Sequence, residues 1–180
     1  MVGMEVAMRH LFTIDLKDYN PEWPHSTRPS ARGVIFRDGK LALIHNGKYD
    51  YYMFPGGGIE EGESHEEALI REVKEESGLV VIPESIREYG SALRLSKSSY
   101  LENTIFEQQN YYYRCETQDT IETTEFDVHE IEEKYSLVFL TLEEAVRRNR
   151  ANDHGEENGS VWIERETRIM ELLMEENANV

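Results

Sequence analysis

The stretch that decides the fold runs from Gly57 to Leu79 and reads GGIEEGESHEEALIREVKEESGL. Ser64 is followed three residues later by Glu67, a capping box that predicts the start of a helix. The helix can continue to Ser77, because Gly78 supplies the left-handed residue that ends many helices. The stretch therefore predicts a glycine-containing loop that leads directly into a capped helix.

One side of this helix is expected to be buried, and the side next to it is acidic. Leu69 and Val73 share a core stripe when successive residues are placed about 100° apart. Three carboxylates border that stripe within an arc of about 100°, namely Glu72, Glu75 and Glu76. Like charges at these spacings destabilise a helix by roughly 0.2 to 0.5 kcal/mol per pair, a penalty that a divalent cation would reverse. Oxygen ligands without Cys or His favour Mg²⁺ or Mn²⁺; the alternative, in a chain so rich in glutamate, is a solvated acidic face.

Residues of this stretch also stand at fixed spacings. The pattern Gly-x5-Glu-x7-Arg-Glu-aliphatic-x-Glu-Glu-x-Gly-aliphatic is matched at every position, by Gly57, Glu63, Arg71, Glu72, Val73, Glu75, Glu76, Gly78 and Leu79. This pattern is the Nudix box, so the sequence resembles the Nudix hydrolases. The resemblance implies an α/β/α sandwich with a mixed central β-sheet. It also implies that the main catalytic metal ligands are Glu72, Glu75 and Glu76, with Arg71 and Glu63 in supporting roles.

Two other phosphate-binding motifs fail at the same place. The glycine spacing from Gly57 to Gly62 is that of a P-loop, but Glu63 stands where the phosphate-binding lysine is required. A dinucleotide-binding fingerprint fails because Glu61 replaces its third glycine. Both kinds of nucleotide-binding loop are thereby excluded.

An anionic protein needs cations to hold an anionic diphosphate. We expect one or more Mg²⁺ ions, with Mn²⁺ as an alternative, held by Glu72, Glu75, Glu76 and the backbone carbonyl of Gly56. Such ions bridge phosphate oxygens and activate water. The sequence thus predicts a Mg²⁺-dependent hydrolase that cleaves the pyrophosphate bond of a nucleoside diphosphate derivative or a nucleoside triphosphate. A catalytically silent, nucleotide-sensing module of the same fold is the alternative, and the complete glutamate set argues against it.

The sequence says less about the identity of the general base and of the group attached to the diphosphate. Members of the family that the sequence resembles often recruit a further glutamate outside the box. In the acidic segment 125–133 the leading candidates are Glu130 and Glu133, with His129 a weaker one. A diphosphate isomerase is disfavoured because Cys115 lies in no recognisable catalytic context. Several aromatic side chains either stack on a base or face the core: Tyr51, Tyr52, Phe54, Tyr111, Tyr112 and Tyr113.

The composition narrows the class of partner. The chain has 180 residues, 36 acidic against 19 Lys and Arg, and a net charge of −17, the wrong sign for duplex nucleic acid. Its apolar runs are too short for a membrane span or a signal peptide, and the single Cys115 excludes an intrachain disulfide framework. We therefore expect a cytoplasmic protein with a small-molecule nucleotide or diphosphate substrate and no membrane or duplex partner.

Hairpin-type strands mixed with a few helices predict an α+β fold. Asp38-Gly39 is suited to a two-residue turn between strands at 34–37 and 40–44. Further strands are expected at 10–16, 51–54, 79–82, 89–95, 104–115 and 134–140, and further helices at 141–150 and 160–176. The last helix is expected to add stability and to have no direct chemical role.

Two parts of the chain are expected. Residues 1–30 contain a strand and a proline-rich connector without regular structure, packed on the domain, and residues 31–180 form the Nudix-type domain. In the connector, Trp23, His25 and Arg28 are interpreted as either a lid or a contact in a homodimer. The sequence does not decide between these two roles.

Overall fold

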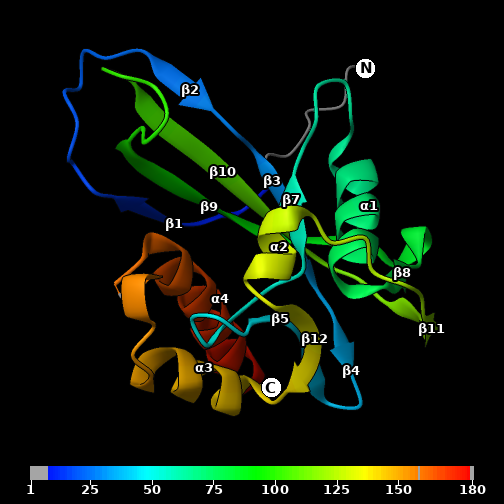
Figure 1. Ribbon diagram of the computed structural model, residues 1–180. Helices are drawn as coiled ribbons and strands as arrows, with labels where there is room; N and C mark the ends of the chain where they lie inside the picture. Colours follow the sequence, from blue (N-terminus) through cyan, green and yellow to red (C-terminus); the bar gives the residue numbers. More distant parts are fainter. Residues whose placement is uncertain (1–7, 158, 179–180) are drawn as a thin grey trace.

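The computed structural model describes residues 8–157 and 159–178, and its largest sheet has six strands (Figure 1). The strand order is β1-β9-β10-β3-β7, and β2 pairs with β10 beside this path. The strands are β1 (His10–Asp15), β2 (His25–Thr27), β3 (Ser30–Val34), β7 (Gly56–Gly58), β9 (Arg87–Lys97) and β10 (Ile105–Arg114). Parallel pairs (β1 with β9, β3 with β10) and antiparallel pairs (β9 with β10, β3 with β7) both occur. The predicted mixed sheet is confirmed.

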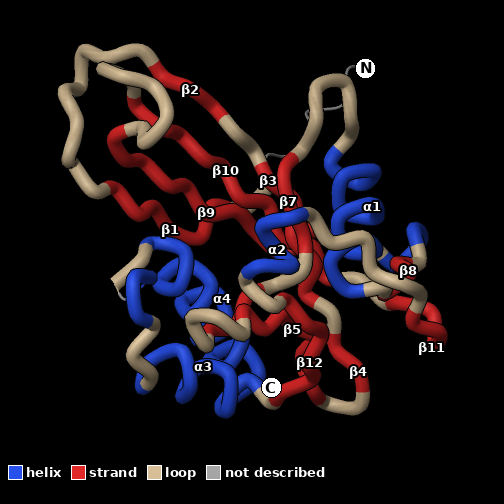
Figure 2. The backbone as a smooth tube through the Cα atoms, viewed as in Figure 1, coloured by secondary structure: helices blue, strands red, loops and turns tan. Residues whose placement is uncertain are grey.

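In the described part of the chain, two smaller sheets and four helices accompany the large sheet (Figure 2). One sheet has the order β12-β5-β4, with β6 paired to β5, and the other pairs β8 with β11. Their strands are β4 (Phe36–Arg37), β5 (Lys40–Asn46), β6 (Tyr51–Met53), β8 (Leu79–Val81), β11 (Thr117–Ile121) and β12 (Tyr135–Leu140). The helices are α1 (His65–Ser77), α2 (Val128–Glu132), α3 (Leu142–Ala151) and α4 (Val161–Ala178), with short 3₁₀ turns at Pro83–Ser85 and Gly155–Glu157.

The strands carry apolar side chains on both faces, and a helical layer covers each face (Figure 1). In β5, Leu41 and Leu43 pack in the cluster that includes Ile169 and Leu173 of α4, whereas Ala42 packs in the cluster of α1. Alternation along a strand sends successive side chains to opposite faces, so a run of apolar residues builds two cores at once. The result is the predicted α+β sandwich, with α1 on one side and α3 and α4 on the other.

The decisive helix forms as the sequence predicts. Ser64 caps α1 by accepting from the Glu67 backbone N–H at 3.2 Å, and the Glu67 carboxylate accepts from the Ser64 backbone N–H at 2.9 Å. Gly78 ends the helix with a φ of 72°. Leu69 and Val73 are both 0% exposed, so the expected core stripe is buried.

The predicted hairpin is present, but its first strand is shorter than expected. Asp38 and Gly39 have positive φ angles of 51° and 74°, and Arg37 pairs with Lys40. The expected strand 34–37 divides at Ile35, because β3 pairs with β10 and β7 while β4 pairs with β5 in another sheet. Ile35 is 0% exposed at this crossing between the two sheets.

Three short elements correct the sequence-based expectation. The proline-rich connector contains β2, whose residues His25 to Thr27 pair with β10, so the prediction of no regular element there is wrong. Strand β11 and helix α2 were not predicted at all. Within residues 8–157 and 159–178, no helix is long and apolar enough to cross a membrane.

Candidate active site

A cleft of about 490 Å³ lies between α1, α2 and the large sheet. Its carboxylate side is formed by the β7 loop, by Glu72 and Glu76 of α1, and by Asp127, His129 and Glu130 at α2. Figure 1 shows α2 beside β7, so a segment far along the chain closes over the glycine loop. The cleft therefore brings the box glutamates next to the segment in which a further acidic residue was expected.

The floor of the cleft is built on Gly56 and Glu76. The φ angle of Gly56 is 135°, and a Cβ there would overlap with the carbonyl oxygen of Ala31, so only glycine fits. This conformation lets the Gly56 backbone N–H donate to Glu76 Oε2 at 2.8 Å. Glu76 is 7% exposed, and burial raises its pKa to about 8, although the nearby Arg32 and the Gly56 hydrogen bond act in the opposite direction.

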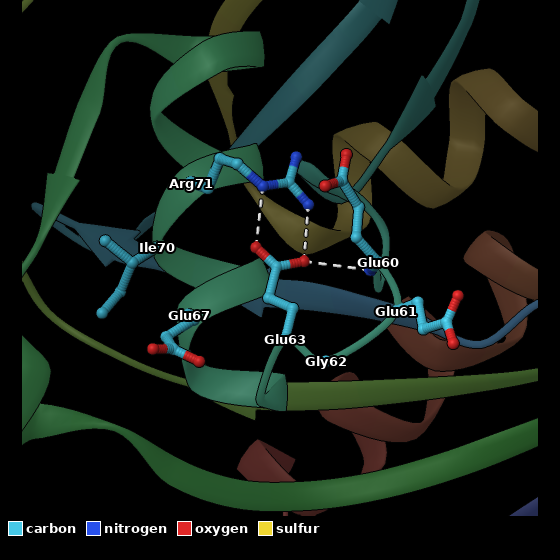
Figure 3. Close-up of a pocket in the computed structure, with 7 residues that line it drawn as sticks. All are labelled: Glu60, Glu61, Gly62, Glu63, Glu67, Ile70 and Arg71. Carbon is cyan, nitrogen blue, oxygen red and sulfur yellow. Dashed lines mark hydrogen bonds and ion pairs between the residues drawn. The ribbon is translucent and has the colours of Figure 1, made fainter.

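Arg71 contacts the other three carboxylates of the box, and Figure 3 shows its pair with Glu63. Its Nε and Nη2 each donate to Glu63 at 2.8 Å, a two-point pair that helps to lower the Glu63 pKa to about 2. Its Nη1 donates to Glu72 at 2.6 Å and to Glu75 at 3.3 Å. A Cβ at Gly57 would overlap with the Glu72 carboxylate, so the glycine permits the close approach of that side chain. Arg71 thus fixes the position of Glu72 at the edge of the cleft.

The glutamates of the Nudix box do not all lie in the cleft. Glu72 and Glu76 line the cleft, whereas Glu63 lines a separate surface hollow with Glu60 and Arg71 (Figure 3). Glu75 is 38% exposed at its side chain, and its backbone oxygen accepts from the Glu125 N–H at 2.8 Å. The three expected ligands therefore lie along one face of the helix, but only two of them meet the cleft.

The donor set fits a hard divalent cation, although it is not gathered into a finished metal site. Among the described residues, no group of three His, Cys, Asp or Glu side chains is arranged to hold a metal ion. The Glu72 carboxylate accepts a hydrogen bond from Arg71, and the Glu76 carboxylate accepts one from the Gly56 backbone N–H. Because each carboxylate has a different partner, the two are held apart. A carboxylate buried beside a second carboxylate is costly when charged, and burial raises the pKa of Glu72 as well. A cation with oxygen ligands would relieve this cost, so these residues fit Mg²⁺ or Mn²⁺.

The two candidates for an additional acidic group separate in the structure. Glu130 lines the cleft, accepts from the Asp127 backbone N–H at 2.7 Å, and has a pKa raised by burial. Glu133 is 6% exposed; it accepts from Asn46 at 2.5 Å and lies 3.1 Å from His129 Nε2. The geometry places Glu130 and His129 at the cleft, with Glu133 behind His129.

The chain matches a known protein family over most of its length. The family model described as NUDIX domain matches residues 27–159, more than half of the chain. The chain belongs to the Nudix hydrolase family.

Individual Nudix relatives match over different lengths. A Bacillus subtilis (strain 168) protein named a putative 8-oxo-dGTP diphosphatase is 33% identical over 127 residues, covering 71% of this chain and 72% of that protein. An ADP-ribose pyrophosphatase of Methanocaldococcus jannaschii is 43% identical over 51 residues, covering 27% of this chain and 30% of that protein. Among solved structures, the MutT protein from Bacillus halodurans is 16% identical with a TM-score of 0.46, covering 67% of this chain and 72% of that chain.

The wall of the Nudix cleft opposite the carboxylates was missed by sequence reasoning. It is formed by β9, β10 and α4, and its residues include Arg94, Ser96, Phe106, Gln108 and Trp162. Arg94 and Ser96 are two residues apart on β9, which is the spacing of one strand face. Nothing local in the sequence indicates that Trp162, at the start of the last helix, would join them.

Several aromatic side chains that were considered for base stacking lie elsewhere. Tyr51, Tyr52, Phe54 and Tyr112 are at most 5% exposed and belong to the core clusters. The ring of Tyr111 packs 4.2 Å from that of His65, and the Tyr113 hydroxyl lies 2.8 Å from His65 Nδ1. From the connector, Arg28 lines the cleft. His25 pairs with Glu107 at 2.5 Å.

Proposed function

We propose that this protein is a Mg²⁺-dependent hydrolase that cleaves the pyrophosphate bond of a nucleoside diphosphate derivative or a nucleoside triphosphate. The observation that carries the proposal is the buried Glu76 carboxylate, 7% exposed, on the floor of a cleft that it shares with Glu72 and Glu130. The names of the relatives, a diphosphatase and a pyrophosphatase, support the same class of reaction. Because these carboxylates line the cleft, we expect an anionic phosphate substrate to bind together with divalent cations.

In this proposal the carboxylate side of the cleft holds the metal, and the cations around the glycine loop hold phosphate. Glu72 and Glu76 are the ligands that the geometry favours, and the roles of Glu75 and the Gly56 carbonyl remain predictions. Bound Mg²⁺ would lower the pKa of water and neutralise charge on the phosphates. Arg28, which would lie 3.8 Å from a Cβ placed at Gly58, is positioned to contact phosphate oxygens.

The remaining residues of the cleft would move or orient the proton of the attacking water. Glu130 reaches the cleft, and its burial raises the pKa of its carboxyl group, which makes it a stronger base once ionised. His129 also lines the cleft and is oriented by the buried Glu133. We assign the role of general base to Glu130 and expect Glu130→Gln to lower kcat more than KM is raised.

The test compares Glu76→Gln with Glu66→Gln, an exposed glutamate on the first turn of the same helix. Each variant and the natural chain are incubated with Mg²⁺ and a panel of nucleoside triphosphates, ADP-ribose, nucleotide sugars and dinucleoside polyphosphates, and the products are scored. We expect Glu76→Gln to lower kcat by about two orders of magnitude or more, whereas Glu66→Gln leaves it unchanged. Full activity in Glu76→Gln would remove Glu76 from the metal site. Tight binding of one nucleotide without turnover of any would instead favour the sensing module.

A further inference from the structure

A planar cation stands in the cleft wall opposite the carboxylates. The guanidinium of Arg94 lies 4.3 Å from the centroid of the Trp162 ring and 5.2 Å from that of Phe106. Aromatic rings against the face of a guanidinium leave its N–H groups directed outward in its own plane. Arg94, Phe106 and Trp162 all line the cleft, so the guanidinium is part of its wall.

This guanidinium has no polar partner among the residues that the structure describes. Its Nε and Nη1 are enclosed and donate no hydrogen bond to any described residue. Burial and the nearby Arg165 lower the pKa of Arg94, although the charge of Asp18 acts in the opposite direction. Arg71 and Arg165, which do not line this cleft, pair with Glu63 and Glu166. Arg32, which does line it, likewise has an enclosed Nε without a hydrogen-bond partner among the described residues. Although the chain has 36 acidic residues, the enclosed Nε and Nη1 of Arg94 donate to none of those that the structure describes.

The neighbours of Arg94 add donors rather than charge. Gln108 Oε1 accepts from Arg165 Nη1 at 3.1 Å, so the oxygen of this amide is occupied and its NH₂ group is the part left for a ligand. Arg165 is itself held by Glu166 at 2.7 Å, which fixes the orientation of the pair. Ser96 Oγ is enclosed without a hydrogen-bond partner among the described residues. The wall therefore offers polar donors to one planar ligand.

We propose that Arg94, with Gln108 and Ser96, binds the nucleobase of the substrate and selects a 6-oxopurine over a 6-aminopurine. This inference rests on the proposed function and names the substrate class of the same cleft. Guanine and hypoxanthine present two acceptors, O6 and N7, on one edge, and an arginine donates to both in plane. Adenine places an NH₂ donor where O6 would be, which leaves an Arg94 N–H unpaired.

A base is favoured over a phosphate at this wall. Two other cations, Arg28 and Arg32, lie with the glycine loop on the carboxylate side, so the phosphates have charged partners there. The rings of Phe106 and Trp162 lie against the Arg94 guanidinium, so its N–H groups lie in one plane and suit the edge of a planar base. Because N7 must accept, the geometry also predicts that 8-oxoguanine, which carries a hydrogen on N7, is a poorer ligand than guanine.

The test measures kcat/KM with Mg²⁺ for dGTP, dITP, dATP, 7-deaza-dGTP and 8-oxo-dGTP. We expect dGTP and dITP to exceed the other three by about 10-fold or more, and Arg94→Met to reduce these ratios to about one. The matched control is Arg114→Met, since Arg114 also stacks on a ring, that of Tyr89 at 5.1 Å, but pairs with Glu176 outside the cleft. Arg114→Met should leave the ratios unchanged. Equal ratios in the natural chain, or unchanged ratios in Arg94→Met, would overturn the proposal.

Two further readouts separate this proposal from a structural role and from the proposed function. Arg94→Met should keep or raise the thermal midpoint, because it removes an unpaired cation from between two rings; a large fall would show that Arg94 serves the fold instead. Binding of non-hydrolysable α,β-methylene analogues of dGTP and dATP is followed by calorimetry. An Arg94-dependent preference for the guanine analogue without turnover of any nucleotide would support the base-binding site and contradict the proposed hydrolase function. Turnover without such a preference would support the hydrolase function and contradict the base-binding site.

Discussion

The buried ion pair between Arg165 and Glu166 gives the sharpest stability prediction. Glu166 is 1% exposed and accepts from the Phe54 backbone N–H at 2.8 Å, from the Tyr112 hydroxyl at 3.0 Å, and from Arg165. It therefore ties α4 to the segment that enters the glycine loop. Glu166→Gln would leave the guanidinium of Arg165, 2% exposed, without its counter-charge. Removing one partner of a buried pair costs about 3–5 kcal/mol, and we expect a loss of that size.

The double variant Arg165→Met/Glu166→Gln provides the decisive comparison. It removes both charges, while the Gln oxygen can still accept from Phe54 or Tyr112, so we expect a loss of only about 1–3 kcal/mol. The measurement is urea unfolding followed by tryptophan fluorescence, with Glu171→Gln as the control. Glu171 pairs with Arg150 at the surface of the same helix and should cost less than about 1 kcal/mol. A double variant as unstable as Glu166→Gln alone would refute the reasoning from unpaired buried charge.

Three further predictions concern the cap, the loop and the pH. Ser64→Ala removes the capping hydrogen bond of α1 and should lower the free energy of unfolding by about 1 kcal/mol in urea titrations. Gly57→Ala places a methyl group against the Glu72 carboxylate, so Mg²⁺-dependent hydrolysis should fall more than the thermal midpoint does. Although burial opposes it, the charges of Arg165 and Arg32 lower the pKa of Glu166 below 4.5. The resulting stability is present above pH 4.5 and is lost as the pH falls below it, and acid titrations of Glu166→Gln should show a shallower loss.

Elements with strong local signals could be predicted from the sequence. The capping box at Ser64, the terminal Gly78 and the Asp38-Gly39 turn each act within a few residues, and the structure contains all three. Helix α2 also carries such a signal, since Asp127 and Glu130 form a capping box, but the helix is only five residues long. The division of the predicted strand at Ile35 depends on pairing with β10, which no local pattern records.

The residues of the candidate site also differ in whether local sequence or tertiary contact determines their position. Glu72 and Glu76 could be placed beside the core because helical spacing alone fixes their direction. The hydrogen bond from Gly56 to Glu76 and the capture of Glu72 by Arg71 depend on how the loop folds back on the helix. Arg94 and Trp162 meet through tertiary packing of β9 against α4, so their partnership was not readable from either segment. The last helix, expected to be structural only, contributes to the cleft.

Helix α4 begins at Val161, two residues after the family match ends at 159. A chain trimmed at that boundary would keep every box residue and still lose Trp162, which lines the cleft, and Glu166, which accepts a hydrogen bond from Phe54 just before the glycine loop. Grafting the final helix from one relative onto another is therefore a direct way to ask how ligand preference diversifies while the acidic half of the cleft stays constant.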